Sequence, residues 1–94
     1  MTYALAVKLT AKDGEEEAVE AALLRVCELS RGEDGCLAFV PHRSLTDPRV
    51  FFVYEHFVDK EAHAAHTQTD HFRDVVEVEI MPRVDFEMLE VEPI

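Results

Sequence analysis

The sequence of 94 residues has few cysteines, no tryptophan and no long apolar run. Its two cysteines, Cys27 and Cys36, are too few for a disulfide scaffold and lack a CxxC spacing, so we expect two reduced, half-buried thiols. The longest apolar runs, such as residues 50–54, are far shorter than the roughly 20 residues that a membrane-spanning helix needs. No basic segment followed by an apolar stretch opens the sequence, which predicts a cytoplasmic protein without a signal peptide.

Basic residues are also scarce. Nine Lys and Arg stand against twenty Asp and Glu, which leaves a formal net charge of −11. Such a surface repels phosphate backbones and anionic lipids, so we expect neither a nucleic acid nor a membrane as a partner. The hydrophobic fraction of 48% is typical of a soluble globular protein. Because two separate cores would not fit in this length, residues 1–94 are predicted to form a single domain.

Hydrophobic spacing divides the sequence into strands and helices. A period of two over residues 3–9 predicts a strand. Apolar residues at helical spacing then predict an amphipathic helix of roughly 17 residues, with Asp13 as its cap and Glu15, Glu16 and Glu17 in its first turn. Two strands are predicted at 36–45 and 50–58, joined by a turn at 46–49. A short helix at 60–67, capped by Asp59, is followed by a second at 70–81 that Pro82 ends. The last predicted element is a strand at 84–91.

This order of elements, β-α-β-β-α-β, predicts an α+β fold of the ferredoxin-like type. Right-handed crossovers then give a four-stranded antiparallel sheet with its helices on one face. The strands are nevertheless apolar on both faces, because Phe51 and Val53 point opposite to Phe52 and Tyr54. Helices cover only one face, so we expect a homodimer in which two sheets pack face to face, leaving a pocket between sheet and helices in each subunit.

Three segments resemble a known family. They are Gly35-Cys36-Leu37, the run from Asp47-Pro48 through Tyr54, Glu55 and Phe57, and residues 61–66 followed by His71-Phe72. In order and spacing they are similar to the antibiotic biosynthesis monooxygenase family of dimeric α/β-barrel proteins. The resemblance implies oxidation of a quinol or an aromatic polyketide with molecular oxygen, without flavin, metal or haem. The substrate itself then supplies the electrons, and the protein supplies a dry cavity and a base.

The sequence departs from the family pattern at two places. Phe57 stands where the family usually has a tryptophan, so a ring N–H donor is lost. The residues of the haem-degrading branch correspond here to Val7, His66 and Val76, so we do not expect haem cleavage. Two other functions therefore stay open: a dimeric module that binds a small molecule without turnover, and an isomerase of small carbonyl compounds that shuttles a proton between His66 and Glu55.

His66 and Glu55 are the candidate catalytic residues. The resemblance places His66 toward the cavity, where it acts as a base or donor. Glu55 alternates onto the apolar face, where it either pairs with an arginine such as Arg43 or orients a pocket histidine. The candidate substrate-binding residues are Phe51, Phe57, His71, Phe72 and Val7, whose aromatic members favour a flat apolar ligand.

Histidines are concentrated in one part of the sequence. His63 and His66 share a helix face, and His71 or Glu55 would complete a three-ligand metal site. A single helical pair with a third residue beyond a break is a weak metal pattern, so we predict no metal and no other cofactor. We expect His56 and His63 to be solvated.

Overall fold

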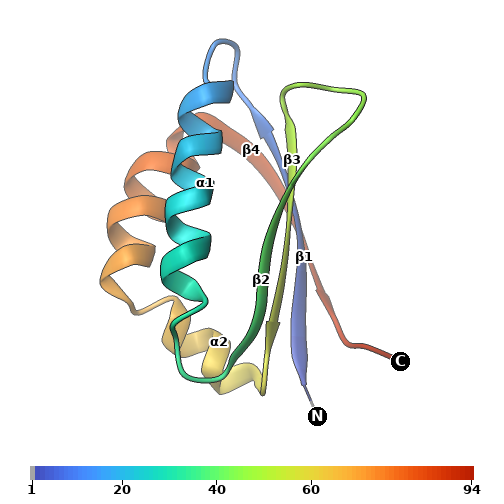
Figure 1. Cartoon of the computed structure of the whole chain (residues 1–94), viewed down its shortest axis with the longest axis vertical. Coiled ribbons are helices and arrows are strands. Elements are labelled where there is room, and N and C mark those ends of the chain that lie inside the picture. Colours follow the sequence, from blue (N-terminus) through green and yellow to red (C-terminus); the bar gives the residue numbers. More distant parts are fainter. Residues whose placement is uncertain (1) are drawn as a thin grey trace.

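Four antiparallel strands form one sheet, and the helices all lie on one of its faces (Figure 1). The computed structural model describes residues 2–94. The sheet order is β2-β3-β1-β4, which confirms the predicted ferredoxin-like α+β fold. In chain order the elements are β1 (Tyr3–Ala11), α1 (Glu16–Ser30), β2 (Cys36–Arg43), β3 (Val50–Phe57), α2 (Lys60–His66), η1 (Phe72–Ile80), η2 (Met81–Arg83) and β4 (Val84–Val91).

The last helical part differs from the single α-helix predicted for residues 70–81. It is a π-helix, η1, followed by a short 3₁₀ turn, η2, that contains Pro82. Proline has no N–H to continue a helix, so the chain enters β4 directly after this turn, as the sequence predicts. No helix within residues 2–94 is long and apolar enough to cross a membrane.

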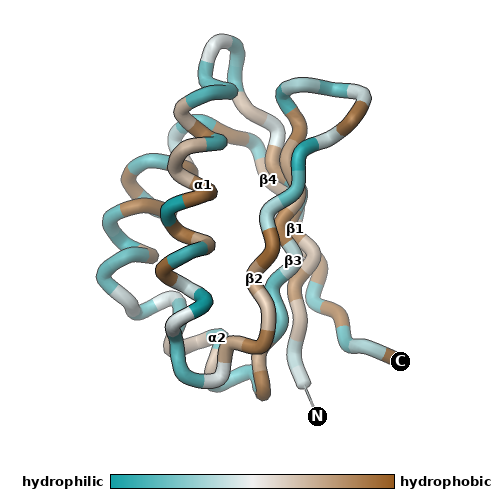
Figure 2. The backbone as a smooth tube through the Cα atoms, viewed as in Figure 1, coloured by the Kyte–Doolittle hydropathy of each residue, from teal (hydrophilic) through white to brown (hydrophobic). Residues whose placement is uncertain are grey.

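Helix α1 packs its predicted apolar stripe against the sheet. Val19, Leu23, Val26 and Cys27 are buried on this side, and Figure 2 shows hydrophobic segments on both α1 and the strands. The predicted cap was wrong, however. Glu15 is the N-cap and makes no side-chain cap bond. Asp13 lies two residues before this N-cap, separated from it by Gly14 with its positive φ of 81°, and pairs with Arg49 at 2.9 Å.

The capping prediction for α2 is confirmed. The Asp59 carboxylate accepts a hydrogen bond from the backbone N–H of Ala62 at 2.8 Å, which satisfies one of the free donors at the helix start. Because α2 begins at this fixed point and runs for seven residues, its last residue, His66, faces the sheet and is 2% exposed.

Gly35 closes the turn between α1 and β2, and its substitution tests this packing. Its φ is +82°, and a Cβ there would lie 2.8 Å from the Ala62 Cβ. We expect Gly35→Ala to lower the free energy of unfolding by about 2 kcal/mol. Gly32→Ala is the matched control, since its nearest contact would be an ordinary 3.5 Å, to the Leu29 carbonyl oxygen. Denaturant unfolding of both variants checks this; equal stabilities would contradict it.

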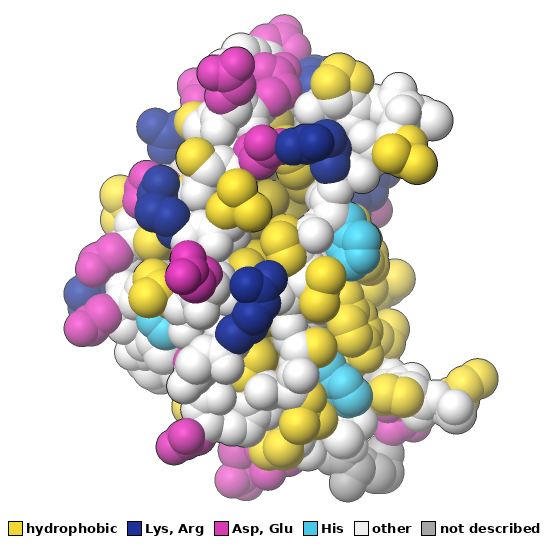
Figure 3. Space-filling model, viewed as in Figure 1, with side chains coloured by type: hydrophobic (Ala, Val, Ile, Leu, Met, Phe, Trp, Pro, Cys, Tyr) yellow, Lys and Arg dark blue, Asp and Glu magenta, His cyan; other side chains and the backbone are white. Residues whose placement is uncertain are grey.

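The two faces of the sheet alternate as predicted. Phe51 and Val53 of β3 are buried on the helix side, whereas Phe52 is 37% exposed on the other side and Val40 of β2 is 40% exposed. Leu89 of β4, which lies opposite Ala6, adds a further exposed apolar side chain to that outer face. Figure 3 shows hydrophobic side chains gathered on the sheet side of the molecule.

Candidate functional site

A cavity of about 250 Å³ lies between the inner face of the sheet and the helices. Its wall is almost entirely apolar, with Glu55, His63, His66 and Thr67 as the polar exceptions. Phe86 and Met88 of β4 contribute to the wall and are 48% and 51% exposed, so the cavity opens toward this edge strand. A flat apolar molecule fits such surroundings. The remaining wall residues are Leu5, Val7, Leu9, Leu23, Val26, Phe39, Val53, Phe72, Val76, Ile80, Met81 and Val84.

His66 lies at the buried end of α2, among aromatic rings. The centroid of its imidazole is 5.2 Å from those of Phe39 and Phe72 and 5.6 Å from that of Phe57. Burial lowers the pKa of His66, and its hydrogen bond to Glu33 opposes this effect. The ring is therefore neutral at physiological pH, which is the state in which a histidine accepts a proton.

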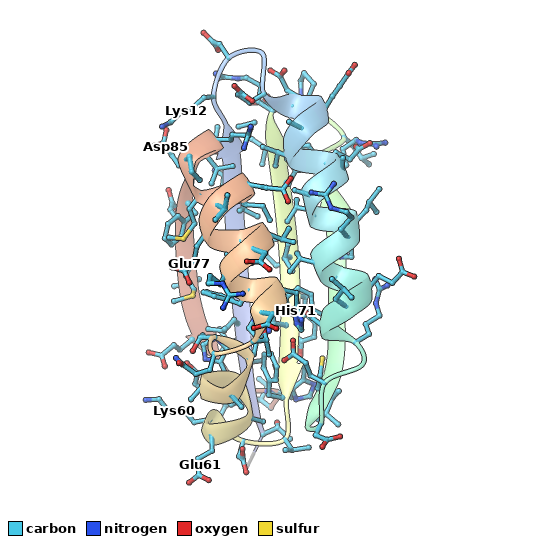
Figure 4. All side chains as sticks on the ribbon, turned by 90° about the vertical axis from the view of Figure 1, so that its left-hand side faces the viewer. Lys12, Lys60, Glu61, His71, Glu77 and Asp85 are labelled. Atoms are coloured by element: carbon cyan, nitrogen blue, oxygen red, sulfur yellow. The ribbon has the colours of Figure 1, made fainter. Side chains whose placement is uncertain are left out.

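Glu33 fixes which ring nitrogen of His66 carries the proton. Its Oε2 atom lies 2.8 Å from His66 Nδ1 and 2.5 Å from His71 Nε2. Because a carboxylate only accepts hydrogen bonds, Nδ1 of His66 is the donor, and Nε2 keeps its lone pair. Figure 4 shows His71 where η1 begins, on the helix side of the molecule. Glu33 thus joins the two histidines from the turn after α1.

Glu55 lies on the other side of the imidazole. Its Oε1 atom is 4.0 Å from His66 Nε2, which is too long for a hydrogen bond, and has no partner among the residues described. Burial, together with the negative charge of Glu33, raises the pKa of Glu55 to about 8. Its carboxyl group is therefore mainly protonated at neutral pH. The predicted pairing with Arg43 was wrong, because Arg43 bonds Glu20 of α1.

The other predicted substrate-binding residues are divided between the cavity and its surroundings. Val7 and Phe72 line the cavity, whereas Phe51 lines a separate hollow with Leu23 and Pro41. Phe57 is fully buried, and its ring centroid lies 5.3 Å from that of His63 and 5.6 Å from that of His66. His71 bonds the Glu33 carboxylate and is not among the residues that line the cavity.

The predicted solvation of two histidines was wrong. His63 is half-buried in the cavity wall, where burial lowers its pKa, and its ring centroid is 6.0 Å from that of His66. His56 faces the outer side of the sheet beside Tyr54, with its Nε2 atom buried. Both cysteines are free, and burial raises the pKa of Cys27 to about 12, so this thiol is unreactive.

Sequence reasoning missed Glu33 altogether. It is 33 residues from His66 in the chain, in a turn where acidic residues are common, and nothing in its neighbourhood marks it.

With His66 and His71, Glu33 also forms the kind of donor set that binds divalent metals, since the three ligand atoms lie within 4.8 Å of one another. The Glu33 oxygen lies 2.5 and 2.8 Å from the two nitrogens, closer than the roughly 3.3 Å between ligands of a tetrahedral zinc ion. The arrangement is that of a hydrogen-bonded cluster.

The chain is similar to known proteins in both sequence and fold. The family model described as "Antibiotic biosynthesis monooxygenase" matches residues 2–78. Among solved structures, a Pseudomonas aeruginosa protein is 26% identical with a TM-score of 0.93, covering 99% of this chain and 94% of its own. A Bacteroides thetaiotaomicron protein of unknown function is 28% identical with a TM-score of 0.89, covering 98% and 97%. A candidate antibiotic biosynthesis monooxygenase of Nitrosomonas europaea is 23% identical with a TM-score of 0.91, covering 98% and 89%. No curated protein matches the sequence.

Proposed function

Since this chain belongs to the antibiotic biosynthesis monooxygenase family, we propose that it oxidises a quinol or an aromatic polyketide with molecular oxygen and without a cofactor. One observation carries this proposal: the neutral imidazole of His66 stands in an apolar cavity with its Nε2 lone pair free. In a reaction without a cofactor the substrate itself must give its electrons to oxygen, so it must first lose a proton. A base in an apolar, aromatic-walled cavity meets this requirement.

The chemistry starts with a proton transfer. His66 Nε2 takes a proton from a hydroxyl group or an activated ring carbon of the substrate, which leaves an electron-rich anion. That anion donates electrons to oxygen. One oxygen atom then enters the substrate in place of two hydrogens, and the other leaves as water. Apolar walls keep bulk water from the anion, and Glu33 stabilises the imidazolium that forms.

Oxygen consumption tests the proposal. Purified protein is treated with a chelator and incubated with a panel of hydroquinones and anthrones in an oxygen-electrode cell. Uptake above that of buffer alone is the expected result. Tight binding of a panel member without any uptake would support a binding module instead and would overturn the monooxygenase.

We also propose that the protein is a homodimer joined through the outer faces of the two sheets. Phe52, Val40 and Leu89 are exposed apolar side chains on that face, and soluble monomers rarely keep such a patch. We expect light scattering to give about twice the chain mass of 10.7 kDa. Phe52→Asp should shift this mass to that of a single chain, whereas Leu45→Asp, at a fully exposed position in the β2–β3 loop, should not. A wild-type monomer would refute the dimer.

A second function is favoured by the pair of polar groups in the cavity. Glu55 and His66 lie 4.0 Å apart and both face the ligand space, which suits an isomerase that moves a proton on a small carbonyl compound. Such a reaction consumes no oxygen. Turnover that persists under anaerobic conditions would identify the isomerase, and turnover that stops would support the monooxygenase.

A further inference from the structure

We propose that Glu55 and His66 together form an oxyanion site for an ionisable phenol or enol hydroxyl; this class of substrate rests on the proposed function. Glu33 is the positioning residue, because its bond to Nδ1 keeps Nε2 of His66 free to accept the ligand proton. Glu55 acts in this site as a hydrogen-bond donor rather than as a base. Glu33 touches no ligand and acts only through the imidazole.

Glu55 is buried with a carboxyl oxygen that has no hydrogen-bond partner in the part of the chain that the structure describes, which suits a site for a ligand oxygen. This residue is 9% exposed and its Oε1 atom has no hydrogen-bond partner within residues 2–94. The ion pairs of the described chain bring no lysine or arginine to it, and the basic side chain that lies within 4.0 Å of it is His66. A buried carboxylate without donors is costly, so the group is present as a neutral acid whose O–H is free to donate.

The spacing of the two polar atoms fits a single oxygen atom. His66 Nε2 and Glu55 Oε1 are 4.0 Å apart, so they do not bond each other. An oxygen placed about 2.8 Å from each of them completes a triangle at ordinary hydrogen-bond lengths. The ring that carries this oxygen then extends into the apolar cavity that both residues line.

The protons balance in this arrangement. The ligand hydroxyl donates to Nε2 of His66, and the Glu55 O–H donates to the same ligand oxygen. When the ligand O–H bond breaks and the Nε2–H bond forms, the oxyanion accepts hydrogen bonds from both residues. The new imidazolium then lies between this oxyanion and the Glu33 carboxylate, which Nδ1 already bonds at 2.8 Å. Glu33 thereby favours the ionised state of the complex.

At mildly alkaline pH, Glu55 is the main group in the site whose charge changes, because the tyrosine, cysteines and histidines packed around it stay neutral. Burial raises the pKa of Tyr3 and of Cys27 to about 12, and it also raises that of Cys36, so these three stay neutral there. Burial lowers the pKa values of His63 and His66, which are therefore neutral as well. Ionisation of Glu55 above about pH 8 should therefore close the oxyanion site.

A chromophoric phenol tests the site without turnover. We would titrate the chelator-treated protein with 4-nitrophenol, whose phenolate absorbs at longer wavelength than the phenol. At a pH where the free probe is mostly protonated, the bound probe should show the phenolate band. Glu55→Leu should weaken phenolate binding about 10–100-fold, the usual effect of losing a hydrogen bond to a charged group. Glu55→Gln should largely restore it, since an amide N–H donates too. Glu20→Gln, outside the cavity, is the control and should bind as the wild type does.

The pH dependence separates donation by Glu55 from a structural role. Relative to Glu55→Gln, the wild-type affinity should fall about tenfold for each pH unit above about 8, because only the wild type gains a carboxylate that repels the phenolate. The ratio cancels the ionisation of the probe and of His66, which both proteins share. A ratio that is independent of pH would overturn the assignment of Glu55 as a proton-bearing donor.

The role of Glu33 has its own readout. Glu33→Gln keeps an acceptor for Nδ1 but removes the charge, so the probe should bind as neutral phenol and the phenolate band should disappear. In the ¹⁵N spectrum of His66, the wild type should show protonated Nδ1, and Glu33→Leu should move the proton to Nε2. Unchanged spectra in both variants would overturn the positioning role.

The site and the monooxygenase can fail separately. Probe binding without oxygen uptake on any substrate leaves the oxyanion site supported and overturns only the monooxygenase. Failure of the wild type to bind any phenolate overturns the site itself.

Discussion

Oxygen uptake by a His66→Ala variant is expected to be about 10²–10⁴-fold slower than that of the wild type, the range that a positioned general base contributes. The substitution removes a ring whose Nε2 lone pair is free because Nδ1 donates to the Glu33 carboxylate. Among the described residues that line the cavity, no other side chain has this arrangement. Without it, the substrate must lose its proton to water in a chamber that excludes water. The initial rate of oxygen consumption at saturating substrate is the measurement.

His63→Ala is the matched control for this experiment. His63 is on the same helix and lines the same cavity, but its ring has no bond to Glu33 that would fix its tautomer. We expect its rate to stay within about tenfold of the wild type. Equal losses in the two variants would show that cavity shape matters rather than proton transfer, and unchanged uptake in His66→Ala would refute the assignment of the base.

Glu55→Gln is expected to stabilise the protein at alkaline pH and to have little effect in acid. Burial raises the pKa of Glu55 from 4.5 to about 8, so between these values the folded state holds a proton that the unfolded state has released. The unfolding free energy of the wild type therefore falls as pH rises through this interval and levels off above it. Between pH 5 and pH 9 the variant should gain on the order of 4 kcal/mol relative to the wild type.

Denaturant unfolding at a fixed protein concentration measures this difference. His66 has a lowered pKa and acts in the opposite direction, adding stability as pH rises toward its ordinary value, but this contribution is present in both proteins and cancels in the comparison. Glu20→Gln, at a partly exposed carboxylate paired with Arg43, is the control and should show a curve parallel to that of the wild type. Parallel curves for Glu55→Gln as well would mean that Glu55 is ionised in the folded protein.

The elements themselves follow from patterns within short stretches of sequence. Alternation along β3 predicts that Phe51 and Val53 face the helices while Phe52 faces away, because side chains of a strand alternate whatever the fold around it. The spacing of Val19, Leu23 and Val26 likewise predicts the buried side of α1. His66 was predicted as a cavity residue from the resemblance to the family, and the structure places it there at the end of the short helix that Asp59 caps.

Features that depend on distant parts of the chain could not be predicted in this way. The surroundings of Glu55 are an example: its place on β3 was compatible with an arginine or a histidine beside it, and only the packing of α1 beside β2 assigned Arg43 to Glu20. The unusual form of η1 is another. The sequence by itself determined the strands, the helices and the apolar inner face, because these arise from periodicity. Only the tertiary structure brought Glu33 to His66 and left Glu55 without a donor, because both are properties of contacts between segments far apart in the chain.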